Sequence, residues 1–148
     1  MKNPFTFKTS KTSEAFPHYP MTNTRLDGLI RQISQEVTGQ LGYWQFDIEG
    51  RDILVITDEI HNRMRIMSPV AAQDGLDQGE MTRLLEANFS SALDAKYALR
   101  DQTLWSVFTH PLAQLYEEQF VDCAAQVANL ANNFGSSYAS SNLVFGGS

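Results

Sequence analysis

One cysteine, Cys123, is the residue of this 148-residue chain that could most directly act as a nucleophile. A reactive thiol needs a neighbouring base and a position that lowers its pKa, such as a helix N-terminus or a cationic pocket. Cys123 lies instead on an apolar stripe with helical spacing, within the last helix that the sequence predicts. Burial in such a stripe raises the pKa of a thiol, so we expect Cys123 to be structural and unreactive.

Metal-binding and acid–base chemistry have no better candidates. The three histidines, His18, His61 and His110, are not at zinc-ligand spacing from one another or from Cys123. The pairs of adjacent carboxylates fall in an expected turn and at an expected helix start, and adjacent residues point in different directions. The sequence has no phosphate-binding glycine loop, no dinucleotide-binding fingerprint and no GxSxG nucleophile elbow. We therefore predict that the protein is not an enzyme and has no catalytic residues, no metal site and no cofactor.

Arg63 and Arg65 are the remaining candidates for a site, because alternate residues of a strand share a face. The two guanidinium groups could form an anion-binding patch, or they could belong to a solvated or edge-protecting face, which is the commoner role. An enzyme built on this chain would have to combine them with a carboxylate such as Asp47. We favour the solvated face.

The composition limits the choice of partners. The chain has 17 acidic and 11 basic residues, and the net charge of −6 disfavours nucleic acid and anionic membranes as partners. An apolar fraction of 43% and a charged fraction of 19% are typical of one globular domain at this length. No apolar run is long enough to span a bilayer, and the N-terminal residues contain no apolar signal region. Together with the single cysteine, these features predict a cytoplasmic protein.

Hydrophobic periodicity predicts an α+β fold with the element order α-β-β-β-α-β-β-α, in which helices pack on an antiparallel sheet. The expected helices run from 22 to Gly39 or Gly42, from 78 to 89 and from 116 to 134, and the expected strands cover 43–48, 53–56, 63–67, 97–100 and 103–108. These elements form a single domain, residues 22–135, between a flexible arm, residues 1–21, and a flexible tail, residues 136–148.

Four short motifs in the second half of the chain have a familiar order and spacing: LLEANF at 84–89, YAL at 97–99, LW at 104–105 and PL at 111–112. With the preceding helix and three strands, residues 22–134 resemble the class I type III secretion effector chaperones and their Tir-chaperone-like relatives, including YbjN-type proteins. The resemblance implies a homodimeric, non-enzymatic protein that binds an extended segment of a secreted effector. The alternative is a regulatory or interaction module with the same fold and no role in secretion.

Both predicted contact surfaces are apolar. The first three strands carry more apolar side chains than one helix can cover, so we expect part of this sheet to bind the extended segment, unless the last helix covers the surplus. The predicted partner-binding residues are Trp44, Phe46, Leu54, Ile56, Met64 and Ile66. The second helix and second hairpin are expected to form a dimer interface of about 1,600 Å². Its predicted residues are Met81, Leu84, Leu85, Phe89, Trp105 and Phe108.

Overall fold

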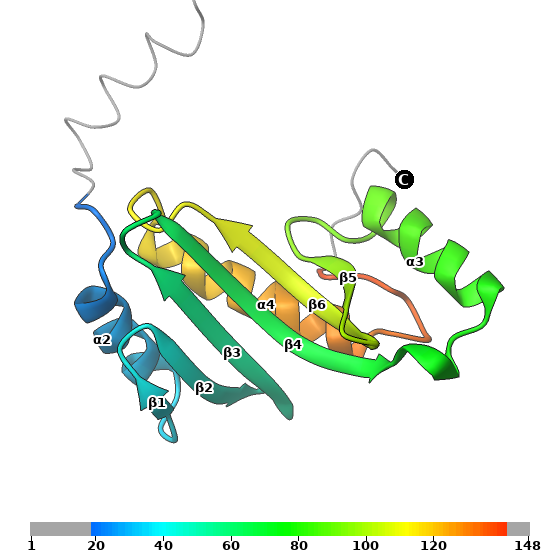
Figure 1. The fold of residues 1–148 in the computed structure, drawn as a ribbon, viewed down its shortest axis with the longest axis horizontal. Coiled ribbons are helices and arrows are strands. Elements are labelled where there is room, and N and C mark those ends of the chain that lie inside the picture. The colour runs from blue at the N-terminus through cyan, green and yellow to red at the C-terminus, as the bar shows by residue number, and fades with distance from the viewer. Residues whose placement is uncertain (1–18, 142–148) are drawn as a thin grey trace, which may run out of the picture.

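The computed structural model of the chain describes residues 19–141. In chain order its elements are α2 (Asn23–Ile33), β1 (Thr38–Gln40), β2 (Tyr43–Ile48), β3 (Arg51–Asp58), β4 (Arg63–Ala72), the 3-10 helix η1 (Gln73–Gly75), α3 (Gln78–Ser90), β5 (Lys96–Arg100), β6 (Thr103–His110) and α4 (Glu117–Asn132). Figure 1 shows their arrangement.

The strands form one antiparallel sheet with the order β1-β2-β3-β4-β6-β5. Strands β1 to β4 follow one another as a meander. The chain then leaves the sheet through η1 and α3 and returns as the β5–β6 hairpin, in which β6 pairs with β4. Strand β5 therefore forms one edge of the sheet and the short β1 forms the other.

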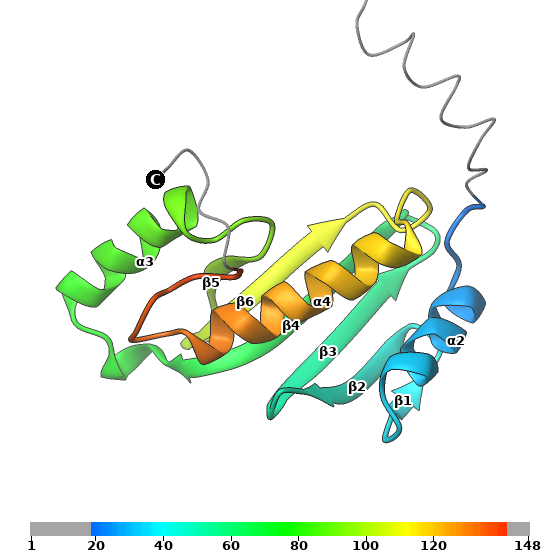
Figure 2. The same cartoon turned by 180° about the vertical axis from the view of Figure 1, so that it is seen from behind.

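Helices α2 and α4 cover the same face of this sheet (Figure 2). The side chain of Thr22 caps α2 by accepting a hydrogen bond from the backbone N–H of Arg25 at 3.2 Å. The indole N–H of Trp44 donates to Asp27 of α2 at 2.9 Å, which ties this helix to β2. The hydrogen bond from Trp44, followed by that from Arg31, lowers the pKa of Asp27.

Helix α4 supplies the larger part of this cover. Its buried side chains include the predicted stripe of Phe120, Cys123, Ala124, Val127, Leu130 and Ala131. All of these except Ala131 form one core with buried side chains of α2 and of the sheet.

Helix α3 has a different position, because it lies beside the β5 edge of the sheet rather than across a face (Figure 1). Asp77 and Glu80 form a reciprocal capping box at its start. Only Leu84 and Ala87 of α3 are buried. No helix within residues 19–141 has both the length and the apolar character needed to span a bilayer.

The predicted α+β class and antiparallel layout are confirmed, with two additions and several corrected boundaries; β4, for example, runs to Ala72 rather than to residue 67. Strand β1 and η1 were not predicted, and α2 ends at Ile33 rather than at Gly39 or Gly42. The predicted tail begins too early: Tyr138 is 6% exposed and Ser140 is fully buried, so the folded part extends past residue 135. Met21, assigned to the arm, is also buried. Residues 1–18 of the predicted arm and residues 142–148 of the tail lie outside the described residues.

Candidate binding surface

The two faces of the sheet divide the predicted partner-binding residues into two groups. Trp44, Phe46, Met64 and Ile66 point toward α2 and α4 and have exposed fractions of 0–3%. The prediction that these four side chains form a contact surface is therefore wrong. The alternative was that the last helix covers them, and in the structure α2 shares this cover with α4. Strand alternation explains the error, because the β3 residues that share their face are Ile53 and Val55, not Leu54 and Ile56.

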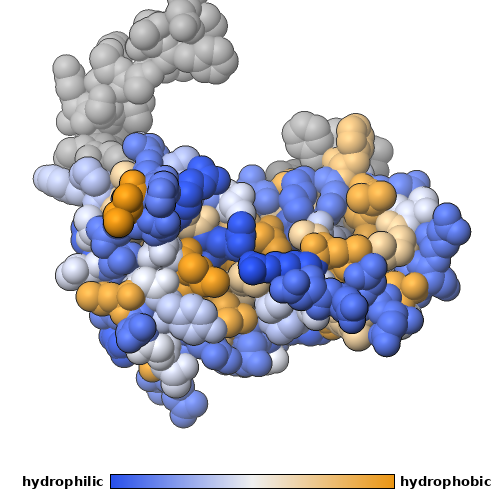
Figure 3. Space-filling view, viewed as in Figure 1, coloured by the Kyte–Doolittle hydropathy of each residue, from blue (hydrophilic) through white to orange (hydrophobic). Residues whose placement is uncertain are grey.

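Leu54 and Ile56 point to the opposite face, which we call the open face because no helix within residues 19–141 crosses it (Figure 1). The strand register places two rows of side chains on it: Ile56, Arg65 and Thr109 in one row, and Leu54, Met67 and Val107 in the next. Ile56, Arg65 and Thr109 are exposed. Apolar and strongly hydrophilic side chains lie next to one another over this face (Figure 3).

Two shallow hollows lie on the open face. The larger, about 450 Å³, lies over β4, β6 and β5 and is lined by Met67, Trp105 and Val107 among others. The smaller, about 210 Å³, is lined by Ile56, Arg63 and Thr109 among others. Arg65 lines both hollows, so its side chain stands between them. The sequence analysis missed Met67 and Val107, although their positions two residues from Arg65 and from Trp105 place them on the same face.

A third hollow, of about 280 Å³, lies between α3 and the β5 edge and is mainly apolar, with Met81, Leu85 and Leu99 in its lining. Leu85 is 72% exposed and Phe89 is 83% exposed, so α3 presents large apolar side chains to its surroundings.

The predicted dimer residues also fall into two groups, one buried in the core and one at the surface. Leu84 is 4% exposed and Phe108 is 7% exposed, and both belong to the core, so their assignment to an interface is wrong. Leu84 points from α3 toward the sheet, and Phe108 lies on the covered face of β6. Met81, Leu85 and Phe89 remain available on α3, whereas Trp105 lines the large hollow of the open face.

The side chain of Asn88 on α3 forms hydrogen bonds with part of the free backbone edge of β5. Its side-chain oxygen accepts the backbone N–H of Tyr97 at 2.8 Å, and its side-chain nitrogen donates to the Tyr97 carbonyl at 3.0 Å. The amide thus takes the place that a neighbouring strand would occupy at Tyr97. Antiparallel pairing makes every second residue face outward, so the next edge-facing backbone groups are those of Leu99. Sequence reasoning missed this contact, which depends on the position of α3.

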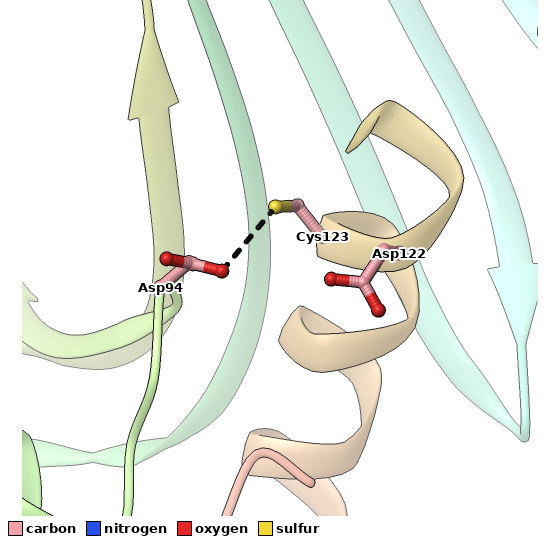
Figure 4. A group of neighbouring side chains, drawn as sticks. All are labelled: Asp94, Asp122 and Cys123. Carbon is pink, nitrogen blue, oxygen red and sulfur yellow. Dashed lines mark hydrogen bonds between the residues drawn. The ribbon is translucent and has the colours of Figure 1, made fainter. Parts of the chain in front are cut away.

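Asp94, Asp122 and Cys123 form a group of potential metal ligands (Figure 4). The buried side chain of Gln126 accounts for this group. Its nitrogen donates to both carboxylates at 2.9 Å, and its oxygen accepts the backbone N–H groups of Asp94 and Ala95. Burial, and then the negative charges of Asp94 and Asp122, raise the pKa of the Cys123 thiol to about 12. A protonated thiol is a poor nucleophile. The hydrogen bonds of Gln126 hold the residues before β5 against α4.

Comparisons with known proteins agree with this architecture. No family model matches the sequence, and no curated protein matches it either. Among solved structures, a chain of the HopA1–SchA chaperone–effector complex superposes with a TM-score of 0.58 at 13% identity, covering 75% of this chain and 90% of that one. A chain of the ExsC–ExsE complex gives a TM-score of 0.56 at 14% identity, with 74% and 90% covered.

These matches define the class of fold. The chain shares its α+β fold with these two chains, and the resemblance predicted from the sequence is confirmed at the level of the fold. Identities this low do not carry a partner or a role from one protein to another.

Proposed function

We propose that this protein is a non-enzymatic, cytoplasmic, chaperone-like binding protein that holds an extended segment of an effector-type protein partner on its open face. The main support is the open face itself, where Ile56 is 37% exposed beside two hollows in a chain whose other sheet face is filled by α2 and α4. Apolar surface bordered by charges is typical of a protein-interaction site. The fold shared with a chain of a chaperone–effector complex favours the same class of function.

An extended segment suits this surface better than a globular partner does. The hollows are shallow, and they lie along strands whose side chains repeat every two residues. A bound strand has the same repeat, so its alternate side chains can enter successive hollows.

The function also includes a homodimer formed through α3. Leu85 and Phe89 are the exposed large apolar side chains of this helix, and Leu85 also lines the apolar hollow between α3 and the β5 edge. Packing two copies of this surface together would remove these side chains from water, in an interface of about 1,600 Å² in total. The dimer surface on α3 is separate from the rows that carry Ile56 and Arg65.

Affinity capture with the full-length chain from its native host tests the binding function. We expect limited proteolysis of the captured complex to leave a protected partner segment that has no globular fold by itself. A synthetic copy of that segment should compete for capture. Binding that requires a folded domain of the partner, or reproducible chemical turnover by the purified chain, would contradict the proposal.

Light scattering tests the dimer separately. The wild-type chain should have twice the monomer mass at high micromolar concentration, and Leu85→Asp combined with Phe89→Asp should give a folded monomer. Val121→Asp is a matched control, because Val121 is a 41% exposed side chain on α4, and it should leave the mass unchanged. A monomeric wild-type chain at that concentration would rule out the dimer.

A further inference from the structure

Arg65 is one of several cationic side chains within residues 19–141 that have no ionic partner. Arg25 pairs with Glu117, Arg31 pairs with Asp27, and the guanidinium of Arg100 lies 3.4 Å from Asp101. Arg65 is exposed at the centre of the open face and forms no ion pair within residues 19–141. Arg63, two residues earlier on β4, is also exposed and forms no ion pair within these residues, so β4 presents positive charge to the open face.

Apolar side chains lie next to this charge, together with Asp58 and Arg63 in the smaller hollow and Arg100 in the larger. Ile56 is the cross-strand neighbour of Arg65 on β3, and Met67, two residues further along β4, faces the same way. Trp105 and Val107 line the large hollow together with Arg65. An anion that binds among apolar groups is less screened by water than one on a polar surface, so a carboxylate here gains more from the guanidinium.

The strand geometry gives the spacing of a complementary ligand. Residues two apart on β4 lie roughly 7 Å from each other, which is also the distance between alternate side chains of an extended peptide. A peptide that runs along β4 can therefore place one side chain over Arg65 and the next side chain of the same face in the hollow lined by Met67 and Trp105.

We infer that the open face selects extended segments in which an Asp or Glu is separated by one residue from a large apolar residue. The carboxylate binds Arg65 and the apolar side chain enters the large hollow. This inference rests on the proposed function and adds the chemistry of the partner. Charge complementarity favours such a segment over a second copy of the chain, whose dimer surface on α3 is apolar.

Selection from a displayed library of random 12-residue peptides, with the full-length chain as bait, tests the inference. The wild-type chain should enrich peptides with an acidic residue two positions from an apolar one. Arg65→Glu should shift the enrichment toward Lys or Arg at the same position. Arg83→Glu makes the same change of charge on α3, away from the open face, and should enrich the same peptides as wild type. For one selected peptide, replacing its acidic residue by the amide should weaken binding to wild type about tenfold. The same replacement should strengthen binding to Arg65→Glu, because it removes a like-charge contact.

The other possible results of this selection contradict either the peptide preference alone or the proposed function as well. Enriched peptides with no acidic preference, or a preference that survives Arg65→Glu, would overturn this inference and leave the proposed function standing. No enrichment by any variant would overturn both. A change in molar mass caused by Arg65→Glu would show that a second copy covers the open face. Thermal melts should confirm that the variants fold, and if Arg65→Glu does not, Arg65→Gln must abolish the acidic preference.

Discussion

The two faces of β4 show how one strand can serve both stability and binding. Met64 and Ile66 point to the covered face and are buried beneath the helices, whereas Arg63 and Arg65 alternate with them and are exposed. The same strand therefore has a core face and a face available to a partner. Apolar content alone therefore does not identify the binding face of the sheet, because the more apolar face is the one covered by α2 and α4.

The largest expected effect comes from truncating matched isoleucines on the two faces. Ile66→Ala removes a fully buried side chain and should lower the free energy of unfolding by about 3 kcal/mol, through lost burial and the cavity left behind. Ile56→Ala, at 37% exposure, should cost about 1 kcal/mol or less. Urea denaturation measures both, and equal losses would show that the open face is covered.

The region after α4 gives the next largest expected effect. The ring of Tyr138 makes edge-to-face contacts with Tyr97 and Phe134 and lies beneath the guanidinium of Arg83. Tyr138→Ala should lower the free energy of unfolding by about 2 kcal/mol or more. Tyr116→Ala, at a 50% exposed tyrosine, is the control and should have a smaller effect in thermal denaturation. Small and equal effects of the two substitutions would show that the folded domain ends at residue 135, as predicted from the sequence.

A pair of serines tests hydrogen bonding within the covered face. Ser106 of β6 donates to the carbonyl of Val127 on α4 at 2.9 Å. Its cross-strand neighbour, Ser68, has a buried hydroxyl with no hydrogen-bond partner within residues 19–141. Ser106→Ala should cost about 1 kcal/mol, and Ser68→Ala should be neutral or stabilising. Chemical denaturation of both variants would contradict this account if Ser68→Ala proved the more damaging.

The smallest expected effect concerns pH. The pKa of Cys123 is raised from 9.0 to about 12, so the folded protein holds this proton where the unfolded chain releases it. The contribution to stability is complete below about pH 9 and is lost as the pH rises toward 12. Cys123→Ala should therefore show a weaker decline in stability above pH 9 than wild type. Identical pH profiles, or rapid labelling of the native thiol, would contradict the buried position.

The order of elements could be predicted from the sequence because each long element has a strong local pattern. The stripe of α4 and the alternation of β2 are examples, and the capping box at Asp77 marks the start of α3. Strand β1 could not be predicted, because Thr38, Gly39 and Gln40 have no apolar alternation and form a strand only by pairing with β2.

The candidate site was less predictable, because it depends on which side of the sheet the helices occupy. Strand β3 is apolar on both faces, so its pattern does not distinguish Leu54 and Ile56 from the core residues Ile53 and Val55. Asn88 and Tyr138 act through tertiary contacts with Tyr97, and their local sequence contains no signal of those contacts.

The most direct test of the central claim is the affinity of one library-selected peptide for two matched variants of the full-length chain. Ile56→Asp places a charge on the open face, and Val121→Asp places the same charge at a similarly exposed apolar position on α4. Fluorescence anisotropy should show binding weakened about tenfold or more by Ile56→Asp and unchanged by Val121→Asp, with both variants melting near the wild-type temperature. Unchanged binding to a folded Ile56→Asp variant would contradict the assignment of the open face as the binding surface.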